Sequence, residues 1–109
     1  MEKNVQISYD KVEDILYLGK KEKIKFSIDL ALPSGDVILD VGFDGLIKGM
    51  EIFNASQFFS VIQKDLERIK NANFSLVYSP SYASISINLE KDIKSNLIIP
   101  YNKQMVLAE

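Results

Sequence analysis

The chain has 109 residues, with 13 basic and 15 acidic side chains for a net charge of −2, and it contains neither cysteine nor histidine. This slightly acidic balance, with no basic stripe, argues against nucleic-acid and membrane-surface partners. The missing residue types exclude disulfides, thiolate metal sites and a cysteine nucleophile, and remove the commonest general base. The N-terminus has no signal-peptide pattern, and no apolar run approaches about 18 residues, so we expect a cytoplasmic protein with one domain over 1–109.

The first half of the chain predicts an antiparallel β-meander of about five strands over 5–55. Apolar and β-branched residues dominate or alternate with polar ones in five segments, 5–9, 14–19, 24–30, 37–41 and 46–53. Asp44-Gly45, between the last two segments, is a strong signal for a tight hairpin turn. The alternation over 24–30 is the most regular, and it predicts Ile24, Phe26, Ile28 and Leu30 on the inward face.

The period then changes from two to about 3.6 residues, which predicts one amphipathic helix over 56–72 packed on the sheet. Its apolar stripe comprises Phe58, Phe59, Ile62, Leu66 and Ile69. Asn54 and Gln57 have the spacing of a capping box at its start. The strand period returns over 73–101, which predicts two or three C-terminal strands that either extend the first sheet or form a second, smaller one. The predicted class is therefore α+β.

Several short motifs in the first half give the chain a resemblance to a known family. They are Ile7-Ser8-Tyr9-Asp10, Asp14-Ile15-Leu16-Tyr17-Leu18, Val37-Ile38-Leu39-Asp40, Asp44-Gly45 and Gly49-Met50-Glu51-Ile52-Phe53-Asn54-Ala55-Ser56. In order and spacing they resemble the prokaryotic domain of unknown function 2283 family, over about residues 5–56. The resemblance implies a compact β-meander domain of bacteria and archaea with no established activity, so no functional residue is carried over. The extension over 57–109 has no counterpart in the minimal family pattern.

The sharpest chemical candidate is a calcium loop. Residues with the spacing of an EF-hand loop are Asp40, Gly42, Asp44, Gly45, Ile47 and Glu51. Gly42 lacks a ligand oxygen, and the flanking segments read as strands, whereas an EF-hand needs two helices. A hairpin with an Asp-Gly turn explains the same residues and is the preferred interpretation, although cation binding by Asp40, Asp44 and Glu51 stays open.

Three other groups of residues are weaker candidates for chemistry. Asp10, Glu13 and Asp14 could supply paired carboxylates, but they fall at a predicted turn, where such groups are ordinarily solvated. The serines at 79, 81, 84 and 86 lack a histidine base and a Ser-x-x-Lys motif. The glycines at 35, 42, 45 and 49 are interpreted as hairpin punctuation, since no glycine-rich turn opens the helix. We therefore assign no catalytic, metal or cofactor-binding residue and no cofactor.

Aromatic and aliphatic residues exceed what one core needs. The tyrosines are Tyr9, Tyr17, Tyr78, Tyr82 and Tyr101. A stacking platform for single-stranded nucleic acid would need a basic groove, so packing in the core, at a sheet edge or against a second copy is favoured. The sequence thus predicts a non-catalytic protein-interaction or homo-oligomerisation module, with a homodimer preferred. The alternative is a small-molecule-binding domain or an enzyme with a carboxylate site between sheet and helix, for example a pocket lined by Asp10, Asp40 or Glu51.

Overall fold

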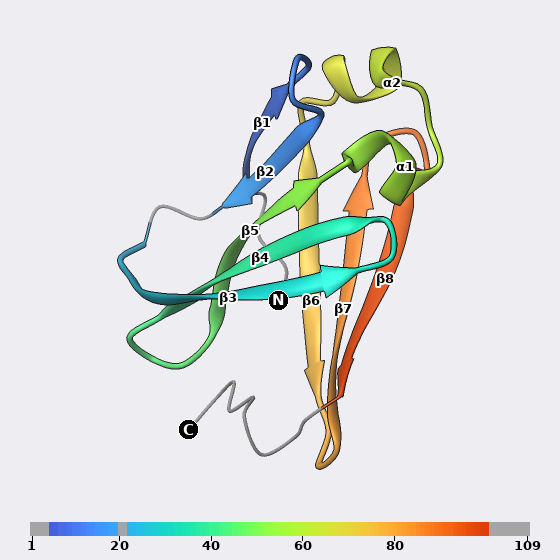
Figure 1. Cartoon of the computed structure of the whole chain (residues 1–109). Helices are drawn as coiled ribbons and strands as arrows, with labels where there is room; N and C mark the ends of the chain where they lie inside the picture. The colour runs from blue at the N-terminus through green and yellow to red at the C-terminus, as the bar shows by residue number, and fades with distance from the viewer. Residues whose placement is uncertain (1–4, 20–21, 101–109) are drawn as a thin grey trace.

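The computed structural model describes residues 5–19 and 22–100, and within them the chain is mostly antiparallel sheet with two short helices (Figure 1). The strands are β1 (Gln6–Asp10), β2 (Ile15–Gly19), β3 (Ile24–Leu32), β4 (Gly35–Gly42), β5 (Ile47–Phe53), β6 (Ala72–Tyr78), β7 (Tyr82–Leu89) and β8 (Lys94–Pro100). The helices are α1 (Ala55–Phe59) and α2 (Gln63–Glu67). Tyr101 and the end of the predicted 73–101 segment lie outside the described residues.

The first five strands form one antiparallel sheet, as the alternation predicts, but the predicted β-meander is wrong because the strands do not pair in sequence order. The order is β1-β2-β5-β4-β3, so β5 lies between β2 and β4, and β1 and β3 are the two edges. The pairing of β2 with β5 sets Leu16 opposite Ile52 and Leu18 opposite Met50. All four side chains are fully buried, and this shared inward face explains why the two strands meet in this register.

The last three strands form a separate antiparallel sheet in the order β6-β7-β8, which settles the alternative left open by the sequence. In β7 the predicted alternation is confirmed, since Ala83, Ile85, Ile87 and Leu89 are buried. Their neighbours Ser84, Ser86 and Asn88 are half-buried on the other face.

The two sheets share one hydrophobic core. Figure 1 shows the three-stranded sheet behind the five-stranded sheet, with both helices at one end of the molecule. The core is formed by the inward-facing residues of both sheets and by a few helix-region side chains, among them Leu39, Met50, Phe59, Leu66 and Ile85. Two layers that each bury one apolar face in this way are typical of a β-sandwich.

The prediction of one helix over 56–72 is wrong. Helix α1 ends at Phe59. The next residue, Ser60, has a left-handed backbone with φ of 57°, and Ile62 is extended before α2 begins. Residue Ala72, expected to close the helix, begins β6. The stripe is accordingly split: Phe59, Leu66 and Ile69 are buried, whereas Ile62 is exposed.

The predicted capping box at Asn54 is also wrong. Asn54 precedes α1, but its backbone is left-handed and its side chain makes no capping hydrogen bond. Instead, its Nδ2 donates to the carbonyl oxygen of Ser34 at 2.9 Å. Asn54 therefore ties the end of β5 to the β3–β4 turn.

The prediction that the apolar side chains of β3 face inward holds for only part of the strand. Ile28, Leu30 and Leu32 pack against the core, whereas Ile24 and Phe26 are 38% and 41% exposed. The register with β4 shifts between Ile24 and Phe26, which marks a bulge or irregularity there. The first part of this edge strand thus leaves large apolar surface uncovered.

Candidate functional site

Several residues of the predicted calcium loop have structural roles in the β4–β5 hairpin. Gly45, with φ of 82°, supplies the left-handed conformation that its turn needs. Asp44 Oδ1 accepts the backbone N–H of Leu46 at 3.0 Å, and its Oδ2 accepts Lys48 Nζ at 2.7 Å. Asp44 therefore serves as a local turn acceptor and as the partner of a cation already present in the chain.

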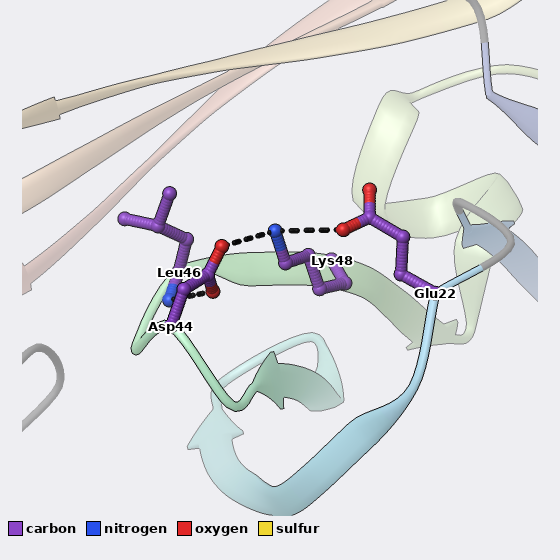
Figure 2. A network of polar contacts seen from close by, with 4 residues as sticks. All are labelled: Glu22, Asp44, Leu46 and Lys48. Carbon is purple, nitrogen blue, oxygen red and sulfur yellow. Dashed lines mark hydrogen bonds and ion pairs between the residues drawn. The ribbon is translucent and has the colours of Figure 1, made fainter.

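Lys48 lies between two carboxylates, as Figure 2 shows. Its Nζ is 2.7 Å from Asp44 and 2.9 Å from Glu22, and only 8% of the residue is exposed. The hydrogen bonds to Asp44 and Glu22 raise the pKa of Lys48 against the opposing effect of its burial. The hydrogen bond from Lys48, followed by that from Leu46, lowers the pKa of Asp44. This arrangement pins the segment before β3 to the hairpin.

Asp40 and Glu51 lie apart from that cluster, on the outer face of the five-stranded sheet. Asp40 accepts a hydrogen bond from the Ser27 hydroxyl at 2.8 Å, and Glu51 is paired with Tyr17 across β2 and β5. Burial, followed by the negative charges of Asp40 and Glu51, raises the pKa of Tyr17. Over residues 5–19 and 22–100, no group of three or more acidic side chains is arranged to hold a metal ion.

Of the three acids near the first turn, Asp14 alone is half-buried, whereas Asp10 and Glu13 are exposed. Asp14 accepts the Tyr9 hydroxyl at 2.6 Å, the Ser56 hydroxyl at 2.7 Å and the Ser56 N–H at 3.1 Å. Its burial would raise the pKa of Asp14, but the hydrogen bonds from Tyr9 and Ser56 outweigh this and lower it. Asp10 accepts the N–H of Glu13 at the exposed turn. The hydrogen bonds of Asp14 therefore have a structural role, because they hold the first hairpin against α1.

The remaining sequence candidates take structural positions. Ser84 lies between Val77 and Ile98 across the three-stranded sheet, and Ser79 donates its N–H to the Tyr82 carbonyl in the β6–β7 turn. Among the glycines, Gly35 and Gly45 occupy turns with positive φ. Gly42 ends β4, whereas Gly49 lies inside β5, so the interpretation of Gly49 as turn punctuation is wrong.

The described tyrosines are dispersed over both sheets. Tyr9 and Tyr17 are half-buried on β1 and β2. Tyr78 and Tyr82 flank the turn between β6 and β7. Burial, with the nearby carboxylate of Asp14, raises the pKa of the Tyr9 hydroxyl. Two of the described tyrosines thus belong to the five-stranded sheet and two to the three-stranded sheet.

A groove of about 310 Å³ lies where an edge strand of each sheet comes close to the other. It is lined by Ile28, Asp29, Leu30, Ala31 and Leu32 of β3 and by Leu97, Ile98 and Ile99 of β8. Both are edge strands of their sheets, and edge strands present backbone N–H and C=O groups that can pair with a further strand. The exposed side chains of Phe26 and Ile98, on the same two strands, add apolar surface to this side of the sandwich.

A second hollow, of about 630 Å³, lies beside the helices and is lined by Ser56, Gln57, Ser60, Val61, Ile62 and Asp65. Neither hollow is lined by Asp10, Asp40 or Glu51, the carboxylates that the alternative function would use. The best-supported candidate site is therefore the groove with its two strands, which we call the β3/β8 edge.

Sequence reasoning missed both the β3/β8 edge and the ion pairs of Lys48. The regular alternation of 24–30 identified an edge-compatible strand, but nothing local indicates that β8 lies next to it. Asp44 and Lys48 are four residues apart across a predicted turn, which was the available signal for their pairing.

Comparison with known proteins identifies a relative and a family. The chain is 30% identical over 86 residues to a protein of Methanosarcina mazei described as a putative hypoxanthine phosphoribosyltransferase, covering 79% of this chain and 67% of that one. No solved structure matches the chain. A family model described as a protein of unknown function (DUF2283) matches residues 6–56, which span β1 to β5 and the start of α1. Residues 6–56 of the chain therefore match the DUF2283 family.

Proposed function

We propose that the chain is a non-catalytic protein-interaction module, present in the cytoplasm, that binds a protein partner at the β3/β8 edge. The observation that carries the proposal is the groove between two edge strands, because backbone pairing at a strand edge supplies affinity and adjacent apolar hollows supply specificity. Phe26 and Ile98, 41% and 64% exposed, extend the apolar surface available to a partner.

The hydrogen bonds of three described carboxylates support the same proposal. The described carboxylates with lowered pKa values, Asp14, Asp44 and Glu90, all accept hydrogen bonds from neighbouring parts of the chain. Glu90 accepts the N–H of Lys70 and the amide of Asn71, and so joins the β7–β8 turn to the segment before β6. The lowered pKa of each carboxylate therefore has a structural explanation that needs no substrate.

Photo-cross-linking in living cells tests the proposal. A photoactivatable residue would replace Phe26 or Ile98 in turn, with Val12 as a control because it is 89% exposed at the β1–β2 turn. We expect a protein adduct of discrete mass from Phe26 and Ile98 but not from Val12. An absence of adducts from both edge positions, or equal adducts from all three, would contradict the proposal.

The description of the relative as a putative hypoxanthine phosphoribosyltransferase suggests a rival function that can be tested directly. Hypoxanthine would be added to the purified chain while its melting temperature is measured, since a ligand of the native state raises that temperature. We expect no shift. A saturable rise would favour the alternative of a small-molecule-binding domain or enzyme.

A further inference from the structure

The turn of the β4–β5 hairpin carries a large apolar side chain that the fold leaves in solvent. The N–H of Gly45 donates to the Gly42 carbonyl at 3.0 Å and closes a four-residue turn, so Phe43 occupies one of its two central positions. Central turn residues are ordinarily small or polar. Phe43 is large and apolar, and it is 69% exposed.

Two further exposed apolar side chains lie at the same end of the five-stranded sheet. Leu46 leads out of the turn, where its carbonyl accepts the N–H of Gly42 at 2.9 Å, and it is 43% exposed. Ile24, at the start of β3, is paired with Gly42 and is 38% exposed. We call Phe43, Leu46 and Ile24 the hairpin tip. Apolar side chains gathered at one exposed place are typical of protein or membrane contacts.

The two carboxylates beside the hairpin tip are already bonded to a cation of the chain itself. Glu22 and Asp44 contact Nζ of Lys48 at 2.9 and 2.7 Å (Figure 2). Lys23 and Lys25, in contrast, are exposed, and over residues 5–19 and 22–100 no carboxylate lies within ion-pair distance of either. The hairpin tip is therefore flanked by two lysines whose charge no ion pair compensates.

Apolar side chains beside uncompensated lysines fit the surface of an anionic lipid bilayer. The apolar groups enter the boundary between head groups and acyl chains, and each lysine near an anionic surface adds attraction. Four lysines occur within the six residues 20–25 of the sequence, a density typical of segments that bind anionic head groups. The acidic balance of the whole chain opposes this contact only weakly, because charges more than about 10 Å away are largely screened.

We infer that the hairpin tip binds the surface of an anionic lipid bilayer, with Phe43 inserted among the head groups and Lys23 and Lys25 bound to them. This contact goes beyond the proposed function, since it uses the β4–β5 turn and leaves the groove between β3 and β8 free for a protein. The bonds of Asp44 to Lys48 and to the Leu46 N–H hold the turn in shape before it meets the lipid, which limits the entropy lost on binding.

Co-sedimentation of the whole chain with lipid vesicles tests the inference. We expect binding to vesicles of equimolar phosphatidylglycerol and phosphatidylcholine, and binding about tenfold weaker or less to phosphatidylcholine alone. Phe43→Ser should weaken binding to the anionic vesicles about tenfold or more, because its apolar side chain no longer enters the bilayer. The double variant Lys23→Glu with Lys25→Glu should weaken it at least as much, because it keeps the apolar residues and reverses the charge.

Val12 provides the matched control. It is 89% exposed on the β1–β2 turn, which lies at the opposite end of the sheet from the β4–β5 turn (Figure 1). We expect Val12→Ser to bind the anionic vesicles as the wild type does. All of these side chains are exposed, so urea denaturation should show the variants to be as stable as the wild type.

Tryptophan fluorescence gives a second readout at the tip itself. The chain has no tryptophan, so Phe43→Trp and Val12→Trp each introduce a single reporter of a residue type that favours membrane interfaces. We expect anionic vesicles to shift the emission of Phe43→Trp to shorter wavelength, because the indole leaves water, and to leave that of Val12→Trp unchanged.

The results separate this inference from the proposed function. No binding to anionic vesicles, equal binding to both vesicle types, or binding by Phe43→Ser at the level of the wild type would overturn the lipid contact. A protein adduct from a photoactivatable residue in place of Phe43, without vesicle binding, would assign the hairpin tip to a protein and also overturn it. Adducts from Ile98 test the β3/β8 edge whatever the vesicles show.

Discussion

Ser56 donates two hydrogen bonds to Asp14, a residue 42 positions earlier in the chain: its hydroxyl to Oδ2 at 2.7 Å and its backbone N–H to Oδ1 at 3.1 Å. The carbonyl of Asp14 also accepts the N–H of Ala55 at 3.0 Å. Two free N–H groups in the first turn of α1 are thus satisfied from the β1–β2 turn, in place of a capping side chain at Asn54.

Replacing Asp14 by alanine should reduce the free energy of unfolding by about 1–2 kcal/mol, because a helix cap and a charged acceptor are lost together. Asp14→Asn should cost less, since asparagine tolerates the positive φ of 56° and keeps one acceptor oxygen. Urea denaturation measures both. Asp10→Asn is the control, because Asp10 accepts only an exposed turn N–H; an equal loss there would contradict the role of Asp14.

The same contacts predict how stability depends on pH. The pKa of Asp14 is lower in the folded chain than in the unfolded chain, so its stabilising contribution is complete above the unfolded value of about 3.8 and is lost as the pH falls through the folded value. Denaturation measured from neutral to acidic pH should show stability falling in this window. The fall should be smaller in Asp14→Asn; an identical profile in the variant would contradict the assignment.

Calcium should leave the melting temperature unchanged. Asp44 is already bonded to Lys48 and to the N–H of Leu46, so a cation would have to displace both groups. A calcium titration monitored by thermal unfolding tests this, since binding to the native state would raise the transition. A saturable rise that Asp44→Asn abolishes would show that the hairpin binds cations after all.

Gly49 and Gly42 provide a matched pair of substitutions in the same hairpin. A Cβ on Gly49 would lie 2.8 Å from the Leu18 carbonyl oxygen and 3.1 Å from the Gly19 Cα, which are backbone atoms. A Cβ on Gly42 would meet mainly the Lys48 side chain, which is held by Asp44 and Glu22 but can shift more readily than backbone. Gly49→Ala should therefore destabilise the chain by about 1–3 kcal/mol and Gly42→Ala by less, as measured by urea denaturation. The reverse order would contradict the close approach of β2 and β5.

The limits of prediction from sequence follow from the range of each interaction. The strands could be predicted because the face of a side chain depends on a local period of two, as Ile85 and Ile87 illustrate. The break at Ser60 could not, because a serine in a left-handed conformation carries no local signal comparable to that of glycine. The pairing of β2 with β5 depends on contacts between distant residues, and so does the proximity of β3 to β8 that creates the candidate site.

Amide hydrogen exchange in the two edge strands of the five-stranded sheet tests the interaction account most directly. The account predicts that exchange in β3 slows when cell extract containing the partner is added, while exchange in β1 stays the same. Exchange in β3 that the extract leaves unchanged would contradict the claim that the β3 edge binds a partner.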